Sequence, residues 1–347
     1  MSETIGSLSN ALQSQIAGAS ELSAVSHQPR IIYSTVAVEE VKRLATRYYD
    51  FPSSLTCALY NRGYNDIYRL SSHERQFALR ISPVNRRTRP ALMAELAVIN
   101  HIHSKGIEVA LPIRRSDGDW ITEIMAPEGL RSAIVFSWAN GSTPKHNSEQ
   151  HARQLGRVIA RVHSALDDLV LQSPLPSIEV NYLPRVSLDT ICKGMEPPPA
   201  LLLELTELAH RLDARLNSAL KGLRDWGLCH GDVKNYNARV DDNRCVLFDF
   251  EFCGWGCRLL DLACYRLDAR LQGLETQAWK PFIEEYLALR PDAESSLEHI
   301  GLFMCLRLLW GAARNAERIM EMGIASLPDI LYERLVPYCK EIESELL

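Results

Sequence analysis

One stretch of the chain, HGDVKNYNARVDDNRCVLFDFE at residues 230–251, gathers side chains suited to phosphate chemistry. Two short apolar runs in it flank Asp-Asp-Asn, which predicts a hairpin that turns at 241–244. Stepping back along both strands places Asn237 opposite residue 248 and beside Asp249. Directly opposed residues of a hairpin have side-chain roots about 5 Å apart. The carbonyl oxygen of the amide and the carboxylate therefore converge on one point.

An aspartate and an asparagine form a hard-oxygen pair that suits Mg²⁺, which keeps several waters and takes further ligands from a substrate phosphate. Asp232 precedes Asn237 by five residues on a glycine-containing loop, so it faces the same ion without binding it. A carboxylate there can accept a hydroxyl proton while the metal neutralises a phosphoryl group. The alternative for any one of these acids alone is an ordinary turn or strand-end residue.

The elements that must position these residues divide into two halves. Residues 31–138 are mostly strand-like, and one helix, from near Pro90 to before Gly106, interrupts the strands. The helix carries Leu92, Leu96, Ile99 and Ile102 at helical spacing. We expect five strands, which correspond to the sequences TCALYN, DIYRLSS, RQFALRIS, WITEIM and SAIVFSW.

A charged pair follows from these two periodicities. In RQFALRIS, Arg80 alternates with apolar residues and so projects from the opposite face of its strand. Glu95 lies within the apolar stripe of the following helix, and a buried carboxylate without a partner costs several kcal/mol. The available cation is Arg80, so we expect the two side chains to form an ion pair. The alternative is an incidental surface arginine and glutamate.

Beyond Gly141 the chain is mainly helical, and MEPPPA at 195–200 is its clearest linker. The helix LRLLWGAARNAERIM is expected to be mostly core, although Arg314, Asn315 and Glu317 are candidates to reach an acceptor pocket. The expected helices span 148–169, 199–226, 258–271, 275–289, 296–321 and 328–346.

These motifs resemble a known group. H-x-D-x-x-x-x-N followed after a short hairpin by D-x-[DE] is the signature of the aminoglycoside phosphotransferase-like branch of the protein-kinase-like fold, which includes choline kinases and type II homoserine kinases. LGRVIARVHSAL at 155–166 and the run FDFEFCGWGCRLLDLACYR are also similar to segments of that family. The resemblance covers most of residues 55–315.

The resemblance implies an α+β fold with two lobes, a small antiparallel sheet with a helix and a larger, mostly helical lobe. We expect a flexible arm at 1–30, a nucleotide-binding lobe at 31–138 and a catalytic, acceptor-binding lobe at 139–347. The active site would lie between the lobes.

Roles in catalysis also follow from the resemblance. Asp232 would be the catalytic base, and Asn237 and Asp249 would be magnesium ligands. His230 would hold the loop as a structural residue. Lys234 matches the loop lysine of Ser/Thr protein kinases, where it touches the transferred phosphate, and a solvated lysine is the alternative.

Two further acidic residues, Glu251 and Asp261, are also candidates for a role in the site. Glu251 is a candidate ligand of a second magnesium ion, a binder of a cationic substrate, or a residue that only packs behind the site. Asp261 is expected to cap a helix and to order the catalytic loop.

In the nucleotide half, the resemblance implies that Arg80, fixed by Glu95, clamps the nucleotide phosphates; the commoner residue at this place is lysine. Gly63 would let the backbone approach a phosphate, and Asn65 begins an N-x-x-Y motif like that of phosphotransferase relatives. A plain hairpin turn is the alternative. The adenine base would lie against the linker near Phe136 and Trp138.

The amino-acid composition restricts the classes of molecule that the chain is expected to bind. The chain has 347 residues with a net charge of −5, which does not favour nucleic acid, and no apolar run is long enough to span a membrane. Nine scattered cysteines indicate free thiols and a cytoplasmic location.

The first hypothesis is a phosphotransferase that uses ATP and Mg²⁺ to phosphorylate a hydroxyl of a small molecule, such as an aminoglycoside, an amino alcohol, homoserine or a sugar. A Ser/Thr protein kinase of the bacterial stress-kinase type and a nucleotide-binding pseudokinase are the alternatives. Only a short segment follows Asp249 before the next helix, which favours the small acceptor.

Overall fold

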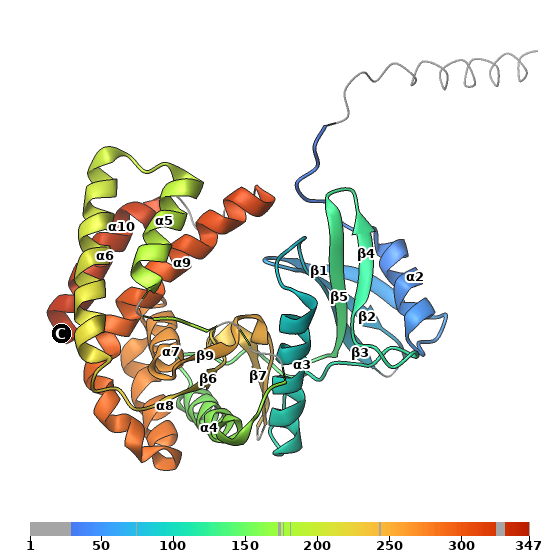
Figure 1. The fold of residues 1–347 in the computed structure, drawn as a ribbon. Coiled ribbons are helices and arrows are strands. Elements are labelled where there is room, and N and C mark those ends of the chain that lie inside the picture. The colour runs from blue at the N-terminus through green and yellow to red at the C-terminus, as the bar shows by residue number, and fades with distance from the viewer. Residues whose placement is uncertain are drawn as a thin grey trace, which may run out of the picture.

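The computed structural model describes residues 29–346, apart from residues 74, 173–174, 176, 181, 243 and 324–329. A sheet with two helices forms one part of the molecule, and a larger, mainly helical region forms the other (Figure 1). This arrangement confirms the expected α+β architecture. The expected arm lies almost wholly outside the described residues, and the boundary between residues 138 and 139 stays a proposal.

All five expected strands form, and they build one antiparallel sheet. Their order is β1-β2-β3-β5-β4, with bounds β1 (Thr56–Arg62), β2 (Asp66–Ser71), β3 (Gln76–Ile81), β4 (Thr122–Ala126) and β5 (Gly129–Ser137). On β3, Leu79 and Ile81 are buried in a small core on one face. Arg80 lies between them and therefore points to the other face, as the strand period of two requires.

A helix that the sequence interpretation missed covers the first face of the sheet. It is α2 (Val38–Tyr48), whose Val41 and Ala45 are buried in the same small core as Leu79. The expectation of one helix before residue 138 was therefore wrong. Its apolar residues Val38, Val41, Ala45 and Tyr48 recur three or four residues apart, which is a helical pattern that the sequence interpretation overlooked.

The predicted helix near Pro90 is α3 (Arg89–Ser104), which stands between the sheet and the helical region (Figure 1). The side chain of Thr88 caps it by accepting a hydrogen bond from the amide of Ala91. Beyond its end, Gly106 adopts a φ of 73°. The four predicted apolar residues are buried, and Glu95 is buried among them.

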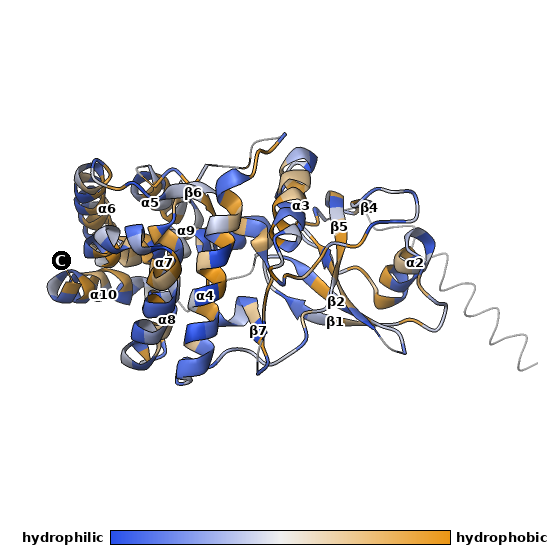
Figure 2. Ribbon diagram, turned by 90° about the horizontal axis from the view of Figure 1, so that it is seen from below, coloured by the Kyte–Doolittle hydropathy of each residue, from blue (hydrophilic) through white to orange (hydrophobic). Residues whose placement is uncertain are grey.

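The helical region contains seven longer helices among the described residues, and α4 packs along α8. Figure 2 shows polar and apolar residues on different sides of α4. The bounds are α4 (Glu149–Ala165), α5 (Leu183–Met195), α6 (Pro199–Ala219), α7 (Leu259–Leu271), α8 (Glu275–Leu289), α9 (Ile300–Met322) and α10 (Ile330–Leu346). None of the described helices is both long and apolar enough to cross a bilayer.

Two expectations in this region were wrong. The helix expected over 199–226 ends at Ala219, because the chain then enters a short strand, β6 (Trp226–Cys229), that pairs with β9 (Gly254–Cys257). Helix α5 was not expected at all.

The predicted hairpin forms with the predicted register. Its strands are β7 (Ala238–Val240) and β8 (Cys245–Leu247), and Val240 pairs with Cys245. Just beyond the paired residues, the amide of Phe248 donates to the backbone oxygen of Asn237 at 3.1 Å.

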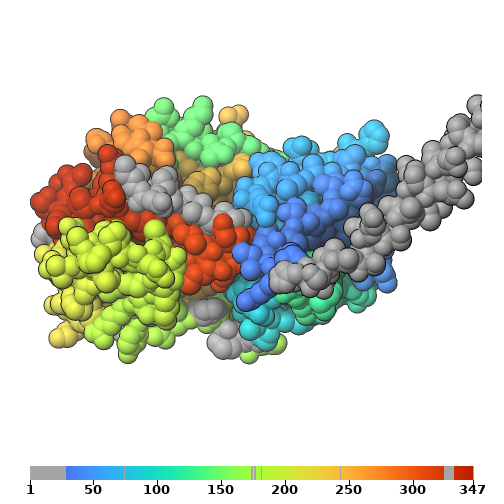
Figure 3. All heavy atoms as spheres, turned by 90° about the horizontal axis from the view of Figure 1, so that it is seen from above, coloured from blue at the N-terminus to red at the C-terminus, as the bar shows by residue number. Residues whose placement is uncertain are grey.

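The two parts of the molecule also meet at the C-terminal end of α9. Seen from above, orange-red atoms of α9 lie against blue atoms of the N-terminal part (Figure 3). Arg86 belongs to the loop that joins β3 to α3. Its Nη1 is 3.4 Å from a carboxylate oxygen of Glu321 on α9.

Candidate active site

A cleft of about 1190 Å³ lies between the sheet and the helical region, and both parts contribute to its walls. Residues of β1, β3 and β5 form the sheet side. The hairpin, α7, α9 and α10 form the opposite side. Of the residues predicted to act in catalysis or to bind the nucleotide or the metal, all except His230 and Glu251 line this cleft.

Asp232 occupies a buried position on the floor of the cleft, between two cations. Its Oδ1 is 2.9 Å from Nζ of Lys234 and 2.5 Å from Nη2 of Arg307. Burial alone would raise the pKa of Asp232, but the two cations outweigh it and hold that pKa below its usual range. Asp232 is therefore an anion at neutral pH, which is the form that accepts a hydroxyl proton.

Asn237 is buried beside the Asp232 carboxylate, which sets the orientation of the Asn237 side-chain amide. Its Nδ2 donates to the backbone oxygen and to Oδ2 of Asp232, both at 2.9 Å. A cation would therefore meet the carbonyl oxygen of Asn237.

Asp249 follows β8 in a left-handed conformation with a φ of 65°. Its partly enclosed position and the nearby Glu251 carboxylate raise its pKa. Because the side chain is exposed to the cleft, the charge of Glu251 is the stronger physical cause. A metal ion would relieve this repulsion, so the donor set of Asn237 and Asp249 fits Mg²⁺. Among the described residues, no group of three or more His, Cys, Asp or Glu side chains is placed to hold a metal.

Asp261, at the start of α7, holds the HGD loop. Its two carboxylate oxygens accept the backbone amides of His230 at 2.7 Å and of Gly231 at 2.8 Å. His163 of α4 donates to the same carboxylate from Nε2 at 3.0 Å. The prediction that Asp261 orders the loop is confirmed, but its side chain does not cap α7, because both oxygens are used by the loop and by His163.

His230 lies beneath the loop and is almost completely buried. Its Nε2 donates to the backbone oxygen of Phe248 at 3.1 Å, which ties the HGD loop to the end of the hairpin. This geometry supports the structural role expected for His230.

Arg80 and Glu95 form the predicted ion pair. The guanidinium donates two hydrogen bonds to the carboxylate, at 2.7 and 3.0 Å, and both side chains are buried. Arg80 also lies 5.0 Å from the centre of the Phe136 ring. Arg87 is a second partner of Glu95 at 3.2 Å, which the sequence interpretation missed.

Glu251 lies behind the cleft rather than in its wall. Its two oxygens accept hydrogen bonds from Asn65 at 2.7 Å and from Nε of Arg86 at 2.9 Å. These contacts place Asn65 where it joins the turn after β1 to the end of the hairpin. A role of Glu251 toward a second metal stays a prediction.

The region expected for the adenine base is built from aromatic side chains. Trp138 and Tyr60 pack edge to face with their rings 5.0 Å apart, and both line the cleft. Gly63 lies in the neighbouring turn, and its amide donates to the backbone oxygen of Asn65 at 3.0 Å.

Several cleft residues on α9 escaped the sequence interpretation. Arg307 contacts Asp232, and Arg318 also lines the cleft. Of the three α9 candidates, Arg314 lines the cleft, whereas Asn315 is buried and bonded to Tyr332. Glu317 pairs with Arg314 and is not among the residues that line the cleft. The signal that indicates α9 is its arginines at positions 307, 314 and 318, which share one helical face.

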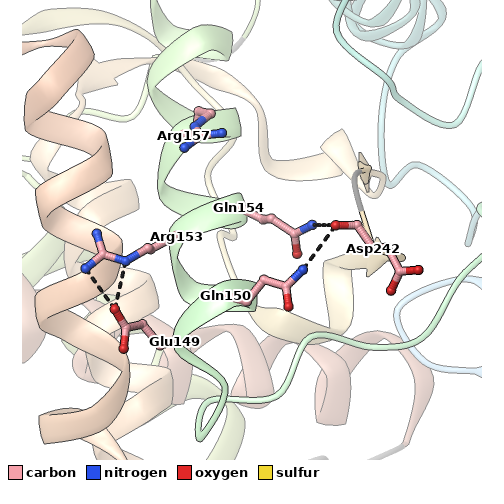
Figure 4. Close-up of a pocket in the computed structure, with 6 residues that line it drawn as sticks. All are labelled: Glu149, Gln150, Arg153, Gln154, Arg157 and Asp242. Carbon is pink, nitrogen blue, oxygen red and sulfur yellow. Dashed lines mark hydrogen bonds and ion pairs between the residues drawn. The ribbon is translucent and has the colours of Figure 1, made fainter.

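A second hollow, of about 530 Å³, lies along the outer face of α4. Figure 4 shows that Gln150 and Gln154 point to the backbone oxygen of Asp242 and that Arg153 bonds Glu149. Arg157 pairs with Glu285. These contacts are structural, so this hollow is not a candidate active site.

Comparisons with known proteins give the context of this cleft. The profile of the phosphotransferase enzyme family, APH, matches residues 57–294. A protein of Deinococcus radiodurans without an assigned function is 32% identical over 280 residues, 79% of this chain and 81% of that protein. A homoserine kinase of Cupriavidus necator is 27% identical over 237 residues, 65% of this chain and 68% of that enzyme.

Solved structures support the kinase-like fold. An amicoumacin kinase in complex with AMP-PNP and Ca²⁺ has a TM-score of 0.70 and 18% identity, and the match covers 90% of this chain and 94% of that one. A microcompartment-associated aminopropanol kinase has a TM-score of 0.69 and 18% identity over 88% and 95% of the two chains. With the family profile spanning both walls of the cleft, the chain belongs to the phosphotransferase enzyme family and is an ATP-dependent phosphotransferase with a hydroxyl group as acceptor.

Proposed function

We propose that the protein transfers the γ-phosphate of ATP to a hydroxyl group of a small molecule, with Mg²⁺ bound by Asn237 and Asp249. The observation that carries the proposal is the convergence of Asp232, Asn237, Asp249 and Arg80 on one cleft, from both sides. Bound there, the ion would neutralise charge on the phosphates.

In this proposal Asp232 orients the acceptor hydroxyl and takes its proton. The acceptor oxygen forms a bond to the γ-phosphorus while the bond between that phosphorus and the bridging oxygen of ADP breaks. ADP carries away the electron pair of the broken bond. Lys234 stays charged next to Asp232 and would face the transferred phosphate.

The nucleotide phosphates would bind to Arg80, which Glu95 and Phe136 hold in place. A rigid guanidinium offers two parallel donors to phosphate oxygens. The adenine base would lie near Trp138. The cytoplasmic location expected from the cysteines is part of the proposal; all nine are described and all are free thiols.

The short connection after Asp249 supports a small acceptor rather than a protein. Only η4 (Phe250–Phe252) and β9 separate it from α7, so no long segment is available as a platform for a peptide.

The test is ADP release from ATP and Mg²⁺ with a panel of hydroxyl compounds, and with casein as a protein acceptor. We expect release with a small acceptor, and Asp232→Asn to lower turnover by about 10²–10⁴-fold while nucleotide binding persists. Asp242→Asn, on the exposed hairpin turn, is the matched control and should leave turnover unchanged. Unchanged turnover in Asp232→Asn, or transfer to casein alone, would overturn the proposal.

A further inference from the structure

The cleft face of α9 is cationic. Arg307, Arg314 and Arg318 follow one another by seven and four residues, so they lie on one side of the helix, and all three line the cleft. In all, seven lining residues are Arg or Lys and four are Asp or Glu. Because of this excess, the cleft is better suited to anions than to cations.

The α9 arginines differ in their partners. Arg307 is paired with Asp232, and Arg314 is paired with Glu317. Arg318 is only 6% exposed, yet it forms no ion pair or side-chain hydrogen bond with any residue in the described part of the chain. Its Nε is buried without an acceptor.

The surroundings of Arg318 hold its guanidinium in place but do not neutralise it. Its terminal carbon lies 4.7 Å from the centre of the Tyr64 ring, which belongs to the turn between β1 and β2. Arg86 and Arg314 lie over the same ring at 5.0 and 5.6 Å. Both neighbouring arginines have carboxylate partners, since Arg86 pairs with Glu251 and Glu321 and Arg314 pairs with Glu317. Arg318 has no such partner among the described residues, and a buried guanidinium without a counter-ion is costly unless an anion joins it.

We infer that Arg318 binds an anionic group, a carboxylate or a phosphate, on the acceptor molecule. This inference rests on the proposed function and narrows its substrate class. The acceptor hydroxyl would face Asp232, and its anionic group would lie farther along α9, at Arg318, because both residues line the same cleft. A purely cationic acceptor would meet repulsion there.

The position of Arg318 also separates it from the expected nucleotide clamp. Arg80 projects from the sheet, whereas Arg318 comes from the C-terminal half of α9. Eleven residues of helix, about 16 Å along its axis, separate Arg318 from Arg307. We assign the anion at Arg318 to the acceptor, and the AMP-PNP affinities in the experiment below test the alternative that it is a phosphate of ATP, because Tyr64 lies next to Gly63.

The experiment has a binding arm and a turnover arm. In the binding arm, glycerol phosphate and glycolate are titrated into the protein saturated with AMP-PNP and Mg²⁺, and the neutral glycerol and ethylene glycol serve as matched probes. The phosphate and carboxylate probes distinguish the two sources of negative charge. The turnover arm measures ADP release with ω-hydroxy carboxylates of increasing chain length, with neutral alcohols of the same lengths, and with homoserine and choline, because a compound as short as glycolate cannot contact Arg318 and Asp232 at once.

We expect at least one anionic probe to bind more tightly than its neutral counterpart. Arg318→Gln should weaken that binding about tenfold or more, because a charge-assisted contact is lost. Arg318→Lys keeps the positive charge and should therefore retain most of the affinity for the anionic probe. Arg153→Gln, on the outer face of α4, is the control and should change nothing. The affinity for AMP-PNP should be equal in all four proteins.

Each other outcome has a distinct meaning. Failure of both anionic probes to bind, or binding that Arg318→Gln leaves unchanged, overturns the inference. A loss of AMP-PNP affinity in Arg318→Gln also overturns it, because the arginine would then serve the nucleotide. Turnover of choline above all anionic compounds refutes the inference but keeps the proposed function. No turnover with any acceptor counts against the proposed function, and the binding arm still decides the role of Arg318.

Discussion

Arg307 of α9 and Asp232 of the HGD loop form a buried ion pair, although 75 residues separate them in the chain. Lys234 contacts the same carboxylate oxygen from within the loop. The ion pair thus joins helix α9 to the residue proposed as catalytic base. Its removal should affect the stability of the whole protein.

Arg307→Met should lower the free energy of unfolding, measured in urea, by about 2–4 kcal/mol, because Asp232 loses a buried partner. The remaining contact with Lys234 keeps the loss from being larger. Arg153→Met, which breaks exposed ion pairs on α4, should cost less than about 1 kcal/mol.

A double-mutant cycle isolates the pair. In the double variant Arg307→Met with Asp232→Asn, the loss should be smaller than the sum of the two single losses. Strict additivity would show that the two side chains do not stabilise each other.

The HGD loop also depends on a glycine that no other residue can replace. Gly231 has a φ of 85°, and a Cβ atom there would lie 2.1 Å from the backbone oxygen of Phe252. Gly273 has a similar φ of 71° with no atom near its Cβ position. Both Gly→Ala variants incur the left-handed strain of about 1–2 kcal/mol, but only Gly231→Ala adds a clash with the backbone.

We expect Gly231→Ala to be less stable than Gly273→Ala by about 2 kcal/mol or more in urea unfolding, or not to fold at all. Equal stability of the two variants would contradict the close approach of the loop to Phe252.

The support of this loop should make stability depend on pH. His163 is buried, its Nε2 donates to Asp261 and its Nδ1 accepts from the hydroxyl of Tyr286 at 2.8 Å. Burial lowers the pKa of His163 despite the neighbouring carboxylate. Since the unfolded chain then binds the proton first, stability should fall as the pH drops below about 6.5, by at most about 1.4 kcal/mol per pH unit.

The measurement is the free energy of unfolding between pH 7 and 5.5 in the wild type and in His163→Gln. We expect the variant to be less stable at pH 7 and to lose less stability on acidification. Wild type and variant must be compared because the raised pKa of Asp249 stabilises the folded state as the pH falls, which opposes the effect of His163 over this range. His73→Gln, at an exposed position, is the control, and an identical slope in His163→Gln would refute the role of His163.

The residues that the sequence predicted correctly are those linked by short-range periodicity. Arg80 and Glu95 could be paired because strand alternation and helical spacing each determine a face. The register of the hairpin placed Asn237 opposite Phe248, the residue before Asp249, because a tight turn determines which residues oppose each other.

The residues that were missed depend on contacts between distant segments. The spacing of the α9 arginines shows that they share one face of the helix, but it does not show whether this face turns to the cleft, where Arg307 reaches Asp232, or to solvent. Helix packing decides that orientation. Similarly, Glu251 could not be assigned from the sequence, because its partner Arg86 lies 165 residues away.

The nucleotide half of the site gives the last prediction. Arg80→Met should raise the dissociation constant for ATP with Mg²⁺ about tenfold or more, because the phosphates lose a charge-assisted contact. Glu95→Gln should have a smaller effect, since it keeps the arginine but weakens its fixed orientation. Arg43→Met, which removes an exposed ion pair with Glu40 on α2, is the control and should bind ATP normally. Calorimetric titration measures all three, and wild-type affinity in Arg80→Met would show that the ion pair is only structural.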